Sequence, residues 1–259
     1  MTDTASTSAT TPATKADGPR GRVRVETSPK RVRALAAGTV VADTAAPLLV
    51  WEGPHYPLYY LPRADFRAEL VDTGRTKRSP SRGDGHVLDV RAGDRVLEGV
   101  AIAYPDSPIP ELRDAVRLDW DAMDEWLEED EPVYTHPRSP YTRIDVLASS
   151  RHVRVSIGGV VLADSHQPRI LFETGLRPRY YLPITDATYE LLRPSSLETH
   201  CPYKGTATYY DVVLPDGTVH ENVVWQYRTP LPESQKVAGL VAFYDERLDV
   251  DVDGVRQPR

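Results

Sequence analysis

The sequence contains a single cysteine, two methionines and three phenylalanines among its 259 residues. Because Cys201 is the only cysteine, the chain cannot form an internal disulfide. The lack of disulfides is typical of proteins from a reducing compartment. No run of about 18 apolar residues occurs, so no membrane-spanning helix and no membrane partner are predicted. The N-terminus also lacks the apolar segment of a secretory signal. We therefore expect a cytoplasmic protein.

Several other features are missing, and each excludes a class of function. The formal net charge is −7, so the chain lacks the basic surface of a nucleic-acid-binding protein, and no nucleic-acid partner is expected. Neither glycine-rich phosphate-binding motif, GxxxxGK[ST] or GxGxxG, is present. The seven histidines never pair along the chain at the spacing of zinc ligands. No metal site and no cofactor are therefore predicted.

The chain does contain an internal repeat. Residues 28–70 match residues 149–191 at 17 of 43 positions without a gap, and the shared motifs include Tyr-Tyr-Leu-Pro at 59–62 and 180–183. Repeats of solenoid proteins are far shorter, so this period predicts two tandem domains. We divide the chain into a disordered tail (1–24), a divergent N-terminal domain (25–131), a linker (132–148) and a C-terminal domain with the better-formed site (149–259).

The local patterns favour strands. Segments 206–213 and 219–227 are rich in β-branched and aromatic residues, and the Pro-Asp-Gly between them is typical of a hairpin turn. The 23 prolines would interrupt long helices. One helix is predicted at 118–130, where Leu118, Ala122 and Trp126 recur at helical spacing. The expected fold class is mainly β, with two tandem compact β-domains and few short helices.

Several motifs of the C-terminal domain occur together. They include Glu173-Thr-Gly175, Arg179-Tyr-Tyr-Leu-Pro183, Thr199-His-Cys-Pro-Tyr-Lys-Gly205 and Trp225. This combination resembles the family called domain of unknown function 427, over nearly all of residues 149–254. The resemblance implies compact, β-tent-like all-β domains, and a nucleotidyltransferase-like label is sometimes attached to the family.

The N-terminal repeat departs from this pattern at one motif. Ser79-Pro-Ser-Arg-Gly83 stands where the C-terminal domain has Cys201-Pro-Tyr-Lys-Gly205, so Cys, Tyr and Lys are replaced by Ser, Ser and Arg. We therefore expect the first domain to be a divergent copy that serves mainly packing.

The best-matched motifs combine aromatic and charged residues. In the strand around residue 180, Arg179 and Tyr181 share one face, while Tyr180 points to the other. An aromatic pocket with a few polar groups is how small ligands are usually held. A β-domain core with tyrosine hydroxyls at its rim would give the same pattern. The candidate ligand-binding residues are Glu173, which can pair with Arg179 or Lys204, together with Arg179, Tyr181, Tyr203 and Trp225.

Cys201 is a second candidate. A lone intracellular cysteine can act as a nucleophile when a nearby base or cation activates it, and Lys204 could lower the pKa of the thiol. His200 is adjacent, but neighbours in a strand point to opposite faces. Cysteine is also among the residue types most often buried, so a small side chain beside a turn is the alternative interpretation. The candidate catalytic residues are Cys201 and Lys204.

Together these patterns predict a small-molecule-binding or accessory module, with its pocket in the second domain and an unknown small molecule as partner. The alternatives are an enzyme that uses Cys201 as nucleophile, a nucleotidyltransferase-like activity, or an interaction scaffold without a cavity. The repeat also predicts intramolecular pairing of the two domains, and it is compatible with a homo-oligomer.

Overall fold

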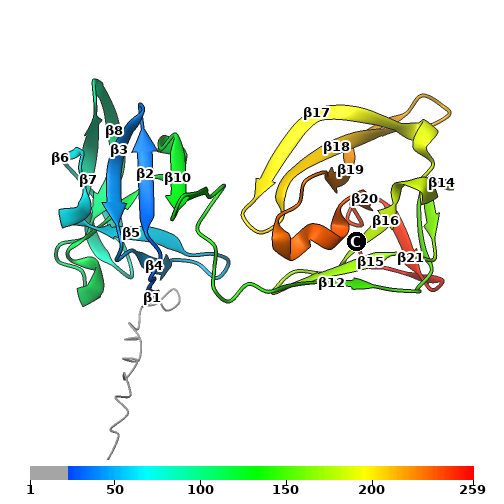
Figure 1. Ribbon diagram of the computed structural model, residues 1–259, viewed down its shortest axis with the longest axis horizontal. Helices are drawn as coiled ribbons and strands as arrows, with labels where there is room; N and C mark the ends of the chain where they lie inside the picture. Colours follow the sequence, from blue (N-terminus) through cyan, green and yellow to red (C-terminus); the bar gives the residue numbers. More distant parts are fainter. Residues whose placement is uncertain (1–22) are drawn as a thin grey trace, which may run out of the picture. The chain divides into compact units, whose positions relative to one another are not determined.

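The computed structural model describes residues 23–259, and the chain divides into two compact units at Arg138 and Ser139 (Figure 1). The predicted disordered tail, 1–24, lies outside the described residues except for its last two. The segment expected to be a linker, 132–148, includes a strand of the second unit, Ile144–Ala148. Strand pairing in the second unit therefore begins before residue 149.

The first unit contains eleven strands and three short 3₁₀ helices. The strands are β1 (Arg24–Thr27), β2 (Val32–Ala36), β3 (Thr39–Thr44), β4 (Leu48–Trp51), β5 (Leu58–Pro62), β6 (Glu69–Ser79), β7 (Gly83–Ala92), β8 (Arg95–Ala103), β9 (Ala115–Leu118), β10 (Glu125–Glu128) and β11 (Glu131–Pro132). The 3₁₀ helices are η1 (Arg63–Asp65), η2 (Pro110–Leu112) and η3 (Trp120–Ala122).

The second unit also contains eleven strands and three 3₁₀ helices. The strands are β12 (Ile144–Ala148), β13 (Val153–Ile157), β14 (Val160–Ser165), β15 (Arg169–Glu173), β16 (Arg179–Pro183), β17 (Leu192–Cys201), β18 (Gly205–Val213), β19 (Val219–Tyr227), β20 (Leu240–Phe243), β21 (Asp249–Val252) and β22 (Val255–Arg256). The 3₁₀ helices are η4 (Ile184–Asp186), η5 (Tyr189–Leu191) and η6 (Pro232–Val237).

The two units share one topology. Each has a seven-stranded antiparallel sheet, in the order β1-β4-β5-β9-β8-β7-β6 in the first unit and β12-β15-β16-β20-β19-β18-β17 in the second. Each also has a four-stranded sheet, β11-β10-β2-β3 or β14-β13-β21-β22. Every strand of one unit thus has a counterpart in the other, and the predicted fold of two tandem β-domains is confirmed.

Each seven-stranded sheet has two buried faces. In the second unit, Leu182, Val212 and Val224 pack against Val153 and Val155 of the four-stranded sheet. On the opposite face, which we call the outer face, Tyr181, Ala207 and Trp225 pack with Val146 of β12 and Val237 of η6. In Figure 1, η6 lies beside β12, beneath the long arching strands β17 and β18. The first unit repeats this arrangement.

The prediction of a helix at 118–130 is wrong. The segment instead forms the end of β9, then η3, then β10. Trp126 of β10 pairs with Ala34 of β2, and its ring stacks on Trp120 at 4.8 Å. The apolar spacing was compatible with either structure, and pairing with the edge of β2 decided the outcome.

The predicted hairpin between β18 and β19 is confirmed. The amide of Leu214 donates to the carbonyl of Thr218 over 2.8 Å, and Gly217 has a φ of +86°. The Asp216 carboxylate accepts from the amide of Thr218 at 2.9 Å, as turn aspartates commonly do. The longest helix of the described chain, η6, has six residues, so no helix in residues 23–259 could cross a bilayer.

The tight packing on the outer face of the first sheet gives a prediction. A Cβ placed on Gly85 would lie 2.5 Å from Cδ1 of Ile102 and 2.7 Å from Cε1 of Tyr104. Gly85→Ala should therefore destabilise the first unit by about 1–3 kcal/mol, because overpacking forces neighbours off their rotamers. Urea unfolding measures the change. Gly53→Ala is the control, since a Cβ there meets nothing within 4 Å, and equal midpoints for the two variants would contradict the prediction.

Candidate functional site

The outer face of the second seven-stranded sheet encloses a cavity of about 360 Å³. Its walls are mostly aromatic, and charged side chains lie among them. The lining residues are Leu171, Glu173, Gly175, Leu176, Arg177, Arg179, Tyr181, Lys204, Tyr209, Trp225, Tyr227, Tyr244 and Glu246.

Strand alternation brings these side chains to one face. Arg179 and Tyr181 are two residues apart on β16, and both line the cavity, whereas Tyr180 packs against the core on the other side. Tyr209 of β18 is paired with Trp225 of β19, so their side chains project from the same face. The sequence-based assignment of faces in β16 is therefore consistent with the structure.

A buried ion pair forms part of the cavity lining. Nζ of Lys204 lies 2.5 Å from Oε2 of Glu173, and the two side chains are only 14% and 9% exposed. Lys204 is held by the β17–β18 hairpin, where its carbonyl accepts a hydrogen bond from the amide of Leu231. Of the two partners considered for Glu173 from the sequence, the structure selects Lys204 over Arg179.

The aromatic walls are joined by directed contacts. Nε1 of Trp225 donates to the hydroxyl of Tyr181 at 3.2 Å, with the two rings edge to face. Tyr244 lies against Trp225 with a centroid distance of 4.6 Å. Burial raises the pKa of Tyr181, and burial together with a hydrogen bond to Tyr209 raises that of Tyr244 to about 12. These phenols are therefore neutral hydrogen-bonding groups near neutral pH.

A second charged group, which we call the rim, consists of Arg179 and Glu246 of the lining and the neighbouring Asp245. The guanidinium of Arg179 pairs with the carboxylates of Asp245 and Glu246 and lies 5.8 Å from the centroid of Trp225. The hydrogen bond from Arg179 lowers the pKa of Glu246 to about 2. Burial instead raises the pKa of Asp245, whose side chain is 7% exposed. The rim thus carries compensated charges.

The structure brings together four of the five candidate ligand-binding residues, namely Glu173, Arg179, Tyr181 and Trp225. Tyr203 is not among the lining residues. Its hydroxyl accepts a hydrogen bond from the amide of Ser139 at 2.6 Å, so it ties the start of the unit to the β17–β18 hairpin.

Sequence reasoning overlooked part of the lining, including Tyr227, Tyr244 and Glu246. Tyr227 could have been found, because it follows Trp225 by two residues on the same strand. Tyr244 and Glu246 lie beyond the end of β20, where strand alternation gives no guidance.

The other catalytic candidate, Cys201, does not line the cavity either. It is half-buried at the end of β17 and pairs with Gly205 across the hairpin. The ammonium of Lys204 is engaged with Glu173, and Nδ1 of His200 lies 2.9 Å from Oγ1 of Thr206. The two catalytic candidates are therefore close in sequence, but the cavity contains only Lys204.

In the first unit, two arginines extend to the carboxylate at the corresponding position. Ile102 of β8 is the register equivalent of Trp225 of β19. Ile102 pairs with Arg117, whereas Trp225 pairs with Ala242, so Arg117 stands where the second unit has Ala242. Arg117 reaches Glu52, the counterpart of Glu173, at 3.4 Å. Arg82, which stands in place of Lys204, also pairs with Glu52.

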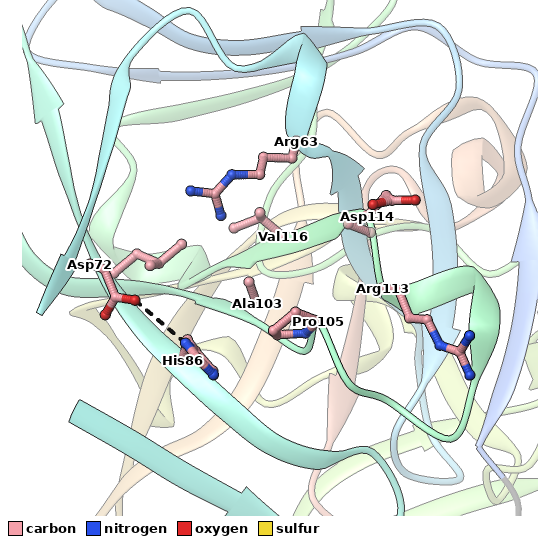
Figure 2. A pocket seen from close by; sticks show the side chains of 10 residues that line it. Arg63, Asp72, His86, Ala103, Pro105, Arg113, Asp114 and Val116 are labelled. Atoms are coloured by element: carbon pink, nitrogen blue, oxygen red, sulfur yellow. Dashed lines mark hydrogen bonds and ion pairs between the residues drawn. The ribbon is translucent and has the colours of Figure 1, made fainter. Parts of the chain in front are cut away.

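The first unit has a cavity of about 300 Å³ elsewhere, toward the four-stranded-sheet face of its large sheet (Figure 2). It is lined by Arg63, Asp72, His86, Leu88, Ala103, Pro105, Arg113, Asp114, Ala115 and Val116. Nδ1 of His86 lies 3.4 Å from Oδ2 of Asp72, and Figure 2 draws this contact as a dashed line.

The second unit closes this other space with a pair of polar side chains. Gln226 and Tyr210 occupy the positions of Ala103 and Leu88, and Nε2 of Gln226 donates to the Tyr210 hydroxyl at 2.7 Å. The two units therefore have cavities on different faces of equivalent sheets. Sequence comparison did not predict a cavity in the first unit.

The ion pair in the second cavity gives a stability prediction. Lys204→Met leaves the carboxylate of Glu173 buried without its cation, so it should cost about 3–5 kcal/mol of unfolding free energy. Lys204→Arg, which carries the residue of the first unit, should cost much less. The measurement is the free energy of unfolding in urea, for both single variants and for the double variant Lys204→Met/Glu173→Met. A double variant no more stable than Lys204→Met alone would count against the buried pair.

The rim gives a prediction about acid. The folded-state pKa of Glu246, about 2, lies below its ordinary value of 4.5. Its contribution to stability is therefore complete above pH 4.5 and is lost as the pH falls toward 2. Arg179→Gln should raise this pKa toward 4.5, as measured by carboxyl NMR titration. Arg177→Gln is the control, because Arg177 pairs with Asp245 at 3.6 Å. The same pKa in wild type and Arg179→Gln would refute this assignment.

The comparisons with known proteins agree with the duplicated fold. The family model described as "Domain of unknown function (DUF427)", named NTP_transf_9, matches residues 24–129 and again residues 145–254. No curated protein matches the sequence significantly. The two matches cover most of the chain, and each falls within one of the two units. The chain therefore belongs to the DUF427 family, as a member with two tandem copies of the domain.

Proposed function

We propose that the second unit is a small-molecule-binding module and that the cavity lined by Tyr181, Tyr209 and Trp225 is its binding site. One observation carries the proposal: a cavity of about 360 Å³ combines aromatic walls with a buried Glu173–Lys204 pair. Ligand sites are typically mostly apolar concavities of about 300–1,000 Å³ with a few fixed polar groups.

The lining also indicates the class of ligand. Tyr209, Trp225 and Tyr244 offer ring faces and edges against which a flat group can pack. The lining has three basic side chains, Arg177, Arg179 and Lys204, and two carboxylates, Glu173 and Glu246. Asp245, which pairs with Arg177 and Arg179, supplies a third carboxylate beside them, so the site carries little net charge. A small molecule with a planar apolar part and neutral or zwitterionic polar groups fits this lining better than a polyanion does.

Nucleotidyl transfer receives less support. Such chemistry uses acidic residues that hold divalent ions beside the phosphates. In this cavity, the carboxylates of Glu173 and Glu246 are each paired with a basic side chain. A triphosphate would have to displace these pairs. The activity implied by the family's model name stays a prediction.

A reaction at Cys201 also stays a prediction. The thiol belongs to the hairpin beside the cavity and not to its lining, and the nearest candidate activator, Lys204, is bound to Glu173. Pairing of the two domains, homo-oligomer formation and a cytoplasmic location likewise remain predictions from the sequence.

The binding proposal can be tested through Trp225. The chain has four tryptophans, and Trp225 is the only one in the second unit. In protein labelled with 5-fluorotryptophan, a ligand in this cavity should shift the ¹⁹F resonance of Trp225 and leave the other three unchanged. The probes are aromatic amino acids, nucleosides and the four ribonucleoside triphosphates. Protein purified without ligand removal is examined in parallel by native mass spectrometry.

The first unit supplies matched control variants. Trp225→Ile and Tyr209→Val introduce the residues that occupy the same register positions in the first unit, Ile102 and Val87. Trp225→Ile also assigns the ¹⁹F resonance, and Tyr209→Val should weaken any binding detected by that resonance. Binding that shifts only the other tryptophans, or that Tyr209→Val leaves unchanged, would place the site elsewhere.

A further inference from the structure

Two histidines and an aspartate lie side by side at one edge of the four-stranded sheet in the second unit. One donor atom from each of His152, Asp164 and His166 lies within 4.8 Å of the other two. Nε2 of His152 is 2.7 Å from Oδ1 of Asp164. The imidazoles of His152 and His166 stack with a centroid distance of 4.2 Å and an interplanar angle of 12°.

Strand register produces this cluster. Val153 of β13 pairs with Ser165 of β14, and both side chains are buried. His152 and His166 are the next residues outward along the two strands, so alternation turns both away from the core. The thirteen residues between them conceal this proximity in the sequence. The histidines show no ligand spacing along the chain, but the fold brings His152 and His166 side by side.

The first unit carries a different arrangement at the same positions. Arg31, Asp43 and Ala45 replace His152, Asp164 and His166. The guanidinium of Arg31 binds both carboxylate oxygens of Asp43, each at 2.7 Å, and Arg67 pairs with the same carboxylate. In the first unit, fixed cations therefore saturate the aspartate.

The second unit has removed most of that positive charge. Thr188 stands in place of Arg67, and its hydroxyl donates to the carbonyl of Val161. Nε of Arg154 lies 3.8 Å from Oδ2 of Asp164. The second unit thus keeps the carboxylate, exchanges one arginine for an imidazole and adds another imidazole. These changes replace immobile cations with groups that can donate electron pairs to a metal ion.

We propose that His152, Asp164 and His166 form a binding site for a divalent first-row transition-metal ion, with Zn²⁺ as the representative. Two imidazole nitrogens and one carboxylate oxygen are a donor set that zinc, nickel and copper accept, whereas Mg²⁺ and Ca²⁺ prefer oxygen donors alone. Zinc lies about 2.0–2.2 Å from such donors, so the side chains must draw together on binding. His152 and Asp164 are 36% and 50% exposed, so their rotation disturbs little packing.

The test is calorimetric titration of the tag-free full chain with Zn²⁺. The expected result is one ion bound per chain, with NMR shifts at the ring protons of His152 and His166. His152→Arg and His166→Ala introduce the residues of the first unit, which the same pair of strands already accommodates there. Each variant should weaken Zn²⁺ binding by at least about tenfold. Residues that only hydrogen-bond to a metal ligand already change metal affinity by about 10–100-fold, and here a ligand itself is removed. His220→Asn, outside the cluster, should bind like wild type.

A reciprocal graft makes the test stricter. Arg31→His combined with Ala45→His and Arg67→Thr removes both arginines that pair with Asp43. This variant should give the first unit the same three donors and raise the stoichiometry to two ions per chain. Unchanged metal-free melting temperatures establish that the variants are folded. The proposal is overturned if Zn²⁺ does not bind at millimolar concentration, if the two cluster variants bind as tightly as wild type, if excess Mg²⁺ displaces the ion, or if the graft gains none.

Discussion

The alternation of side chains across each seven-stranded antiparallel sheet is the constraint on which the rest of the structure depends. A residue assigned to one face of β16 or β18 must stay on that face, because a shift of one position would exchange the core for the outer surface. Both units keep the same strand order and the same pairing around the central strands. Side chains on one face can therefore change without moving those on the other, and this is how the two copies diverged.

A buried carboxylate is the second constraint. Glu52 and Glu173 occupy the same place, and neither can be left without a cation in a largely buried position. The second unit meets this need with the slim side chain of Lys204, which leaves space beside it. The first unit uses Arg82 and Arg117, and the hydroxyl of Tyr60 donates to the same carboxylate at 2.7 Å. The two units therefore hold the same carboxylate with different cations, and in the second unit the cavity lies beside this pair.

Much of the architecture could be predicted from the sequence. The repeat predicted two domains, and strand alternation predicted the faces of Arg179, Tyr180 and Tyr181. The helix at 118–130 failed because its apolar spacing also suits a short strand that completes the four-stranded sheet. The cavity of the first unit depends on Leu88 and Ala103 being smaller than their counterparts, and the His152–His166 pair depends on hairpin register. Such features arise from contacts between strands, and no local pattern in the sequence records them.

The placement of the two cavities on different faces of equivalent sheets has a consequence for the molecule as a whole. Arg117 fills one space in the first unit, and Gln226 with Tyr210 fills the other in the second. A duplicated gene has thus yielded two chemically distinct recesses from one scaffold. Because a single peptide chain joins them, they are always made in equal numbers and turned over together, which two separately encoded proteins could not guarantee.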